Sequence, residues 1–371
     1  MLSMLLLTLL TPASPAYQQP EQITSRFNRA VELQRQAAWN EAAEEYRAVL
    51  AAAPGYAEAR ANLGVVLSRL GNYEDAISSY QEALRLNPAL TPILLNLGIA
   101  HYRVGQFAKA VDALERFLAI APNHTQAHQL IGISLVELGR EREGIPHLES
   151  SLPAAPDDAT VLYSLGLAYL RLGRPELDSI LIRLTSHSDG AALARLLQGQ
   201  ARLESLEIEK AAVDLEAAER LSPDLPRLQF LLGLAYFKLG KSAEARVRYE
   251  RELSRVPTDF LTLYYLGVLL DQQGDLNGAK QRIEAALSQE PQSAEALTLM
   301  GTILLKQGKA QEAAHVLEQA IARQPLASES HYHLARSYQK LGRKEEATRE
   351  FAVVERLKAQ ERDREKGRSR Q

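Results

Sequence analysis

Proline recurs along this chain at a constant spacing, and this spacing limits the possible folds more than any other feature. Eight prolines keep a step of 34 residues, with one longer interval of 67 between the fourth and the fifth: Pro54, Pro88, Pro122, Pro156, Pro223, Pro257, Pro291 and Pro325. Since 67 equals 34 plus 33, one copy of the repeated unit lacks one residue. A period of this length predicts stacked helical hairpins rather than separate globular domains.

Glycine occupies two further positions of the repeat when proline is taken as position 32. Position 8 holds glycine in eight successive copies: Gly64, Gly98, Gly132, Gly166, Gly199, Gly233, Gly267 and Gly301. Position 15 also holds it eight times: Gly71, Gly105, Gly139, Gly173, Gly240, Gly274, Gly308 and Gly342. The first glycine lets the two helices of a hairpin approach closely, and the second can take the left-handed conformation that ends a helix.

The block NLGVVLSRLGNYEDAISSYQEALRLNP, residues 62–88, resembles the tetratricopeptide-repeat family, and the same pattern extends from about residue 23 to residue 354. The resemblance implies an all-α fold, a right-handed superhelical solenoid of about ten helical hairpins. We expect one continuous solenoid domain over residues 17–354, followed by a charged capping helix and tail over residues 355–371. A terminal repeat needs such a polar cap because no further hairpin covers it.

The fifth repeat is the least regular part of the pattern, over residues 174–206. Pro175 stands at the start of its second helix, Asp178 replaces the usual small residue at position 20, and Gly190 lies near the missing proline. In the next hairpin Leu206 replaces glycine at position 15. A local change of superhelical twist and a functional hinge both remain open as interpretations.

Composition excludes several function classes. A formal net charge of −3 provides no basic field for nucleic acid, and the absence of cysteine removes thiolate metal sites and disulfides. His124 and His128 have a spacing that can bind zinc, but no third ligand is evident and polar surface is the favoured interpretation. No nucleotide-binding or hydrolase motif is found, so the sequence predicts neither an enzyme nor a cofactor.

Residues 1–16, MLSMLLLTLLTPASPA, have the character of a signal peptide. Their apolar run is too short to span a bilayer comfortably and is followed by small residues that suit cleavage. We therefore expect an exported protein, periplasmic or secreted. No basic residue precedes the run, so an uncleaved anchor, which would associate the protein with the membrane, remains the alternative.

The family resemblance implies that a partner lies on the concave surface, at positions 2, 5, 6, 9, 12 and 13 of each first helix. Position 6 carries amides that suit a peptide main chain: Asn28, Asn62 and Asn96. Positions 5 and 12 carry aromatic rings that can anchor an apolar side chain: Tyr163, Phe230, Tyr264 and Tyr332, with Tyr102 and Phe237. Position 13 begins a basic row that would favour an acidic segment: Arg35, Arg69 and Arg103.

Each of these sets has a structural alternative. The amides are common at this position in arrays without a known ligand, the rings can pack between neighbouring helices, and the basic residues can complement helix dipoles. The hypothesis is a scaffold or assembly factor that binds a protein or peptide segment in the groove. The alternative is a non-catalytic regulatory or substrate-delivery subunit of a cell-envelope enzyme complex.

We predict that the exported chain loses its first sixteen or so residues, so that the mature protein begins at or near Tyr17. Mass spectrometry of the protein from an envelope fraction would identify this terminus. Recovery of an intact Met1 from the cytosolic fraction would contradict the prediction.

Overall fold

The structure is a computed structural model that describes residues 19–368, which form 20 helices and contain no strand. The predicted all-α architecture of ten hairpins is confirmed. Contacts divide the chain into two compact units, Met1–Gly190 and Ala191–Gln371, and each is described by itself. The division falls inside the irregular stretch 174–206, while the expectation of one continuous domain and that of a hinge stay predictions. The signal segment predicted over residues 1–16 lies outside the described residues.

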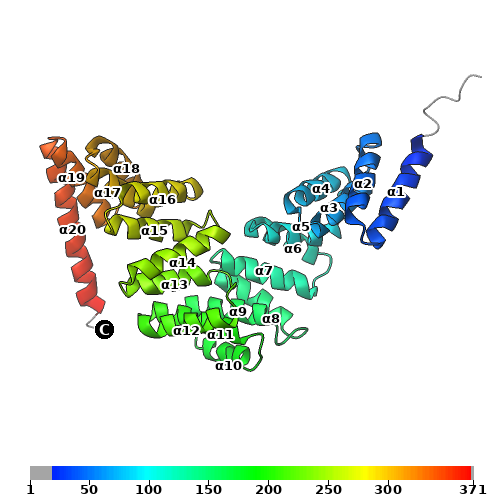
Figure 1. Ribbon diagram of the computed structural model, residues 1–371, viewed down its shortest axis with the longest axis horizontal. Coiled ribbons are helices and arrows are strands. Elements are labelled where there is room, and N and C mark those ends of the chain that lie inside the picture. Colours follow the sequence, from blue (N-terminus) through cyan, green and yellow to red (C-terminus); the bar gives the residue numbers. More distant parts are fainter. Residues whose placement is uncertain (1–18, 369–371) are drawn as a thin grey trace, which may run out of the picture. The chain divides into compact units, whose positions relative to one another are not determined.

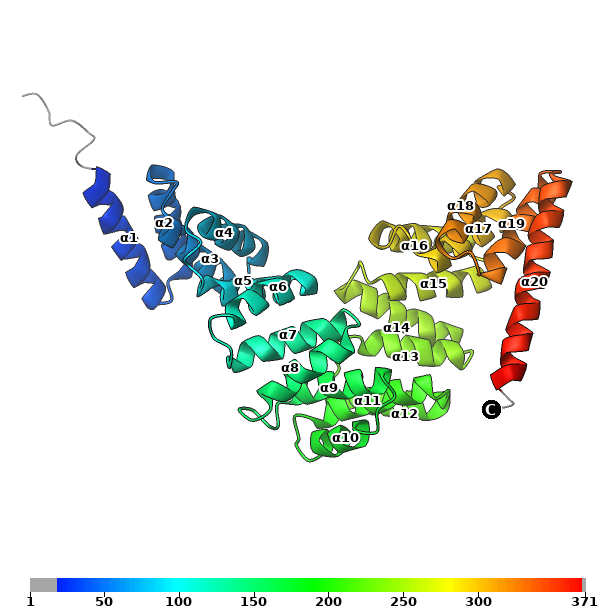
Figure 2. The same ribbon diagram turned by 180° about the vertical axis from the view of Figure 1, so that it is seen from behind.

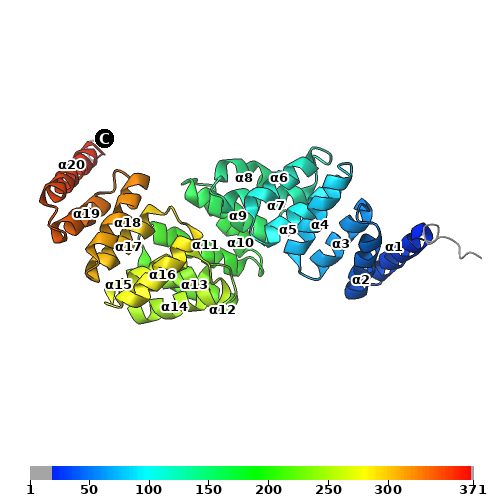
Figure 3. The ribbon, with the colours of Figure 1, turned by 90° about the horizontal axis from the view of Figure 1, so that it is seen from above.

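The first unit contains five hairpins, which follow one another in chain order (Figure 3). Its helices are α1 (Gln19–Arg35), α2 (Trp39–Ala52), α3 (Ala57–Arg69), α4 (Tyr73–Leu86), α5 (Ile93–Arg103), α6 (Phe107–Leu118), α7 (Thr125–Glu137), α8 (Glu141–Ser151), α9 (Ala159–Arg171) and α10 (Leu177–Thr185). With nine residues, α10 is the shortest of these helices, and it begins two residues after the irregular Pro175.

The second unit also contains five hairpins (Figure 1). Its helices are α11 (Ala191–Glu204), α12 (Ile208–Leu221), α13 (Leu228–Lys238), α14 (Ser242–Arg255), α15 (Phe260–Gln272), α16 (Leu276–Gln289), α17 (Ala294–Lys306), α18 (Ala310–Arg323), α19 (Ser328–Lys340) and α20 (Lys344–Arg368). The last helix extends well past α19 as one unbroken element (Figures 1 and 2), with Val354 and Leu357 buried. The segment expected as a capping helix is thus the continuation of the last hairpin's second helix.

The two helices of a hairpin cross where position 8 is glycine. A Cβ atom added at Gly64 would lie 2.6 Å from Cε1 of Tyr80, and one added at Gly98 would lie 2.4 Å from Cγ of Leu114. Gly71 ends α3 with φ +81°, the left-handed geometry expected for position 15. Leu206 has φ +59° at the same position, a conformation that costs a residue with a side chain about 1 kcal/mol.

Neighbouring hairpins are joined by a tyrosine at position 11. Its hydroxyl donates to a glutamate on the second helix of the preceding hairpin at 2.8–2.9 Å, in three pairs: Tyr169 with Glu149, Tyr236 with Glu216, and Tyr338 with Glu318. A cation lies over each of these rings, Arg174, Lys241 and Arg343 respectively. Both units therefore use the same polar joint between hairpins.

First helices and second helices form different sides of each unit. First helices of successive hairpins contact each other, as α5 does with α7 and α17 with α19, whereas no two second helices do so within residues 19–368. The closer approach of the first helices makes their face the inner side of each unit. No helix in this range combines the length and the apolar character needed to cross a membrane.

We predict that Gly98→Leu destabilises the first unit by about 1–3 kcal/mol, because the added side chain must displace the buried Leu114. Gly55→Leu is the matched control, since a Cβ atom there meets nothing within 4 Å. Hydrogen exchange should show the loss of protection in α5 and α6. Equal stability of the two variants would contradict the crossing geometry.

Candidate partner-binding face

We define the first-helix face as the surface formed by positions 2, 5, 6, 9, 12 and 13 of the first helices in each unit. The predicted residues on this face differ widely in exposure. Those of the first unit lie on α1, α3, α5 and α9, and those of the second unit on α13, α15 and α19.

The three predicted amides are not equivalent. Asn28 is exposed, while Asn62 and Asn96 are half-buried. Burial raises the pKa of Tyr46 to about 12, and a hydrogen bond from Asn62 to the Tyr46 hydroxyl partly opposes this shift. That hydroxyl donates to Oε1 of Gln34 at 2.8 Å. Asn62 therefore joins the first two hairpins, which supports the structural alternative at this one position.

The basic residues at position 13 differ in their exposure and contacts along the chain. Arg35, Arg69 and Arg103 are exposed, although Arg35 lies 3.7 Å from Glu32. In later repeats the equivalent cations bind the preceding first helix: Arg171 donates to the Val136 carbonyl at 2.7 Å and Lys340 to the Leu305 carbonyl at 3.1 Å. These carbonyls belong to the last turns of α7 and α17, so the later cations satisfy helix C-termini.

The predicted rings of the first unit are only partly available. Tyr102 is half-buried and makes an edge contact with Phe107, with ring centroids 5.9 Å apart. Burial raises the pKa of Tyr102, and the negative charge of Glu137 adds to this effect. Tyr163 is also half-buried.

The second unit contains an aromatic cluster, which we define as Phe230, Phe237, Tyr249, Tyr264 and Tyr265. Tyr265 lies at its centre, with ring centroids 5.9 Å from Phe230, 6.2 Å from Phe237, 6.5 Å from Tyr249 and 5.4 Å from Tyr264. Phe237, Tyr264 and Tyr265 are half-buried and lie on the first-helix face. Three adjacent rings of this face thus retain exposed surface.

Phe230 differs from the expectation of an exposed ring. Its side chain is 4% exposed and lies against Tyr249 and Tyr265, with the Arg227 guanidinium 5.3 Å from its centroid. The structure therefore places Phe230 in the core, where it supports the cluster and offers no surface to a partner. Tyr332, at the same position of the last hairpin, is 38% exposed and accepts a hydrogen bond from Arg336 at 3.1 Å.

Sequence reasoning missed the importance of Tyr265. It stands at position 6, directly after the selected Tyr264, and its central place follows from rings on α13 and α14 that surround it. The sequence feature that could have indicated its role is the pair of consecutive tyrosines at positions 5 and 6.

The histidines have structural partners. His124 accepts the Ala127 N–H at the start of α7, and Nε2 of His128 lies 2.8 Å from the Pro122 carbonyl. Nδ1 of His128 lies 3.0 Å from Nδ1 of His147, and burial, followed by the charge of His128, lowers the pKa of His147. Within the part of the chain that is described, no three His, Asp or Glu residues are grouped to hold a metal ion.

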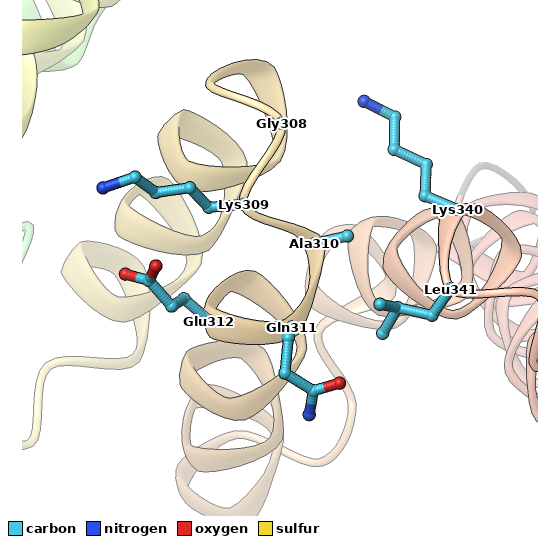
Figure 4. Close-up of a pocket in the computed structure, with 7 residues that line it drawn as sticks. All are labelled: Gly308, Lys309, Ala310, Gln311, Glu312, Lys340 and Leu341. Carbon is cyan, nitrogen blue, oxygen red and sulfur yellow. The ribbon is translucent and has the colours of Figure 1, made fainter.

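A cavity of about 490 Å³ lies beside the turn between α17 and α18 and the end of α19 (Figure 4). Its lining includes Lys309, Glu312 and Lys340, but the two lysine side chains extend in different directions and do not converge on one point (Figure 4). Lys340 also donates to the Leu305 carbonyl. The cavity is therefore not an assembled charge site.

Glu252 contacts the aromatic cluster through the backbone of Phe230. Its side chain is 6% exposed and accepts the Phe230 N–H at 3.3 Å, near the start of α13. Burial raises the pKa of Glu252 above its ordinary 4.5, the Phe230 N–H opposes this shift, and Asp259 adds to it. The charges of Arg255 and Arg227 also oppose the shift. Burial is the largest of these effects, so the pKa of the Glu252 carboxyl is higher in the folded state than in the unfolded state.

Family models of repeated helical hairpins match most of the chain. Two models described as "Tetratricopeptide repeat" match residues 69–132 and residues 27–90, 130–178 and 196–260. A third, described as "Anaphase-promoting complex, cyclosome, subunit 3", matches residues 272–352. A comparison with curated proteins gave no match.

Two solved structures are similar to the chain at low sequence identity. The structure described as "Crystal structure of APC/C hetero-tetramer Cut9-Hcn1" has 15% identity and a TM-score of 0.58, over 91% of this chain and 81% of that one. "MamA 41-end from Desulfovibrio magneticus RS-1" has 21% identity and a TM-score of 0.43, over 46% of this chain and 96% of that one. The likeness to the first of these structures, at this low identity, establishes a common fold alone.

We predict that the contribution of Glu252 to the free energy of unfolding of the second unit falls as pH rises from 4.5 through the folded-state pKa of Glu252. The pKa of Glu252 is higher in the folded state than in the unfolded state. Its protonated form therefore contributes its full stability only at pH values below the unfolded-state pKa, and this contribution is lost as the pH rises through the folded-state pKa. Glu252→Gln should remove this decrease and be more stable at neutral pH. Denaturant titrations at a series of pH values would measure it.

The matched control is Glu250→Gln, since Glu250 is exposed on the same helix and pairs with Arg246. It should leave the slope of stability against pH unchanged. If Glu252→Gln left the dependence of stability on pH unchanged, burial would not be what raises the pKa of the Glu252 carboxyl.

Proposed function

The chain belongs to the tetratricopeptide-repeat family, and we propose that it is a non-catalytic scaffold that binds a segment of a partner protein on its first-helix face. The observation that carries the proposal is the group of three half-exposed rings on the inner side of the second unit, Phe237, Tyr264 and Tyr265. Rings grouped on a recessed face can anchor a partner's apolar side chain, because burying them releases water from a large apolar area.

The chemistry of the face differs between the units. In the first unit, exposed Asn28, Arg69 and Arg103 offer amide and guanidinium groups to a main chain or to carboxylates. In the second unit, the rings offer apolar contact with hydroxyl groups at their edges. A segment with acidic residues suits the face of the first unit, and a segment with one or more apolar anchors suits the face of the second unit.

Export is a further part of the proposal and rests on the sequence of residues 1–16. A processed protein would meet its partner in the periplasm or outside the cell. Its partner would then be an exported or envelope protein.

We predict that Tyr264→Ala abolishes the binding of some peptides on a peptide array and spares others, because a buried aromatic anchor contributes about 2 kcal/mol or more. The double variant Asn28→Ala with Asn96→Ala should instead weaken the binding of many peptides by similar amounts, about 0.5–1.5 kcal/mol for each lost hydrogen bond. Asn62 is left intact because it also bonds Tyr46.

Val247→Ala is the control, since this side chain is 62% exposed on the second helix α14. It should change no affinity. Loss of binding in Val247→Ala together with unchanged binding in the other variants would place the partner on the second-helix face and overturn the proposal.

A further inference from the structure

Position 24 of the repeat holds a buried tyrosine in three hairpins: Tyr46, Tyr80 and Tyr249. Each ring is at most 1% exposed. The rings of Tyr80 and Tyr249 lie against the position-8 glycine of their hairpins, at 2.6 Å and 2.5 Å from an added Cβ atom on Gly64 and Gly233 respectively. The hydroxyl groups of these two rings therefore occupy equivalent places beneath the first-helix face.

In the first unit this hydroxyl has a polar partner from position 12. Tyr46 donates to Oε1 of Gln34 at 2.8 Å and is also bonded by Asn62, from position 6 of the next repeat. The hydroxyl of Tyr80 lies 3.2 Å from Oγ of Ser68. In these two hairpins an uncharged polar side chain at position 12 therefore forms a hydrogen bond with the hydroxyl of the position-24 tyrosine.

The second unit replaces both polar positions with rings. Position 12 is Phe237, and position 6 of the next repeat is Tyr265. The Tyr249 hydroxyl is fully buried and has no hydrogen-bond partner among the described residues. A buried hydroxyl without a partner costs free energy that the folded chain does not recover by itself.

We propose that the Tyr249 hydroxyl is a specificity-determining group that donates to an uncharged oxygen of the bound segment, inserted between Phe237 and Tyr265. This inference rests on the proposed function, because it selects among segments that bind the same first-helix face. Phe237 lies in the last turn of α13 and is partly exposed, so the bound side chain would reach the hydroxyl by displacing the ring of Phe237.

The occupant is a side chain with an apolar stem and a terminal amide oxygen, as in glutamine. Gln34 fills the equivalent place above Tyr46 with such a group. A carboxylate does not fit as well, because the rings of Phe237, Tyr249 and Tyr265 would remove water from its charge without supplying a cation. The stem of the same side chain would contact the faces of Phe237 and Tyr265.

A stability measurement tests whether the hydroxyl is unpartnered. Tyr249→Phe should raise the urea midpoint of the unliganded protein, because it removes an unsatisfied buried group. Tyr46→Phe should lower it, because it removes a hydrogen bond to Gln34. A lowered midpoint in Tyr249→Phe would show that the hydroxyl is already satisfied, and would overturn the inference.

A binding measurement tests the role in specificity. Short array peptides would be synthesised in pairs that differ only at the central position, which is Gln in one member and Leu in the other. The two side chains are similar in size, but only Gln has a terminal amide. For peptides whose binding depends on Tyr264, the Gln member should bind the full-length protein about tenfold more tightly than the Leu member. Tyr249→Phe should reduce this ratio to near one.

The outcomes separate the inference from the proposed function. A Gln-to-Leu ratio near one in the unsubstituted protein, or a ratio that Tyr249→Phe leaves unchanged, overturns the inference while the binding face stands. Absence of any peptide whose binding responds to Tyr264→Ala overturns the proposed function, and the inference with it.

Discussion

At each regular hairpin crossing, the backbone of a position-8 glycine lies directly against a large side chain from position 24 of the second helix. The pairs Gly64 with Tyr80, Gly98 with Leu114 and Gly233 with Tyr249 leave no room for a Cβ atom. This contact sets the distance between the two helices and buries the position-24 side chain. It also directs the end of that side chain toward position 12, so the choice of residue there affects what the first-helix face presents.

The two units use this shared geometry differently. In the first unit the position-24 tyrosines are satisfied by Gln34 and Ser68, and the surface above them carries amides and exposed arginines. In the second unit the corresponding surface carries Phe237 and Tyr265, and the Tyr249 hydroxyl below them has no hydrogen-bond partner within residues 19–368. Rings give apolar anchoring area, but they cannot satisfy a hydroxyl as an amide does. Under the proposed function, the chain gives up stability at this face that a bound partner restores.

The period in the sequence predicted the hairpins because its glycines and prolines act through the backbone alone. Gly71 takes its left-handed conformation whatever surrounds it, and the close crossing at Gly98 needs only the absence of a side chain. The exposure of a face residue depends instead on neighbours from several helices. Phe230 and Tyr264 share position 5, yet Phe230 is buried because Tyr249, Tyr265 and Arg227 surround it. Asn62 likewise bonds a tyrosine of the preceding hairpin, which a position-by-position comparison does not reveal.

The claim that a partner binds the first-helix face is tested most directly by mapping which side chains a bound segment protects. Hydroxyl-radical footprinting of the full-length protein, with and without a peptide selected on an array, reports the solvent accessibility of single side chains. If a partner binds the first-helix face, the bound peptide lowers the oxidation of Tyr264 and Tyr265 and leaves that of the exposed Val213 and Val247 on the second helices unchanged. Protection of Val213 and Val247 with unchanged oxidation of the two tyrosines would contradict it.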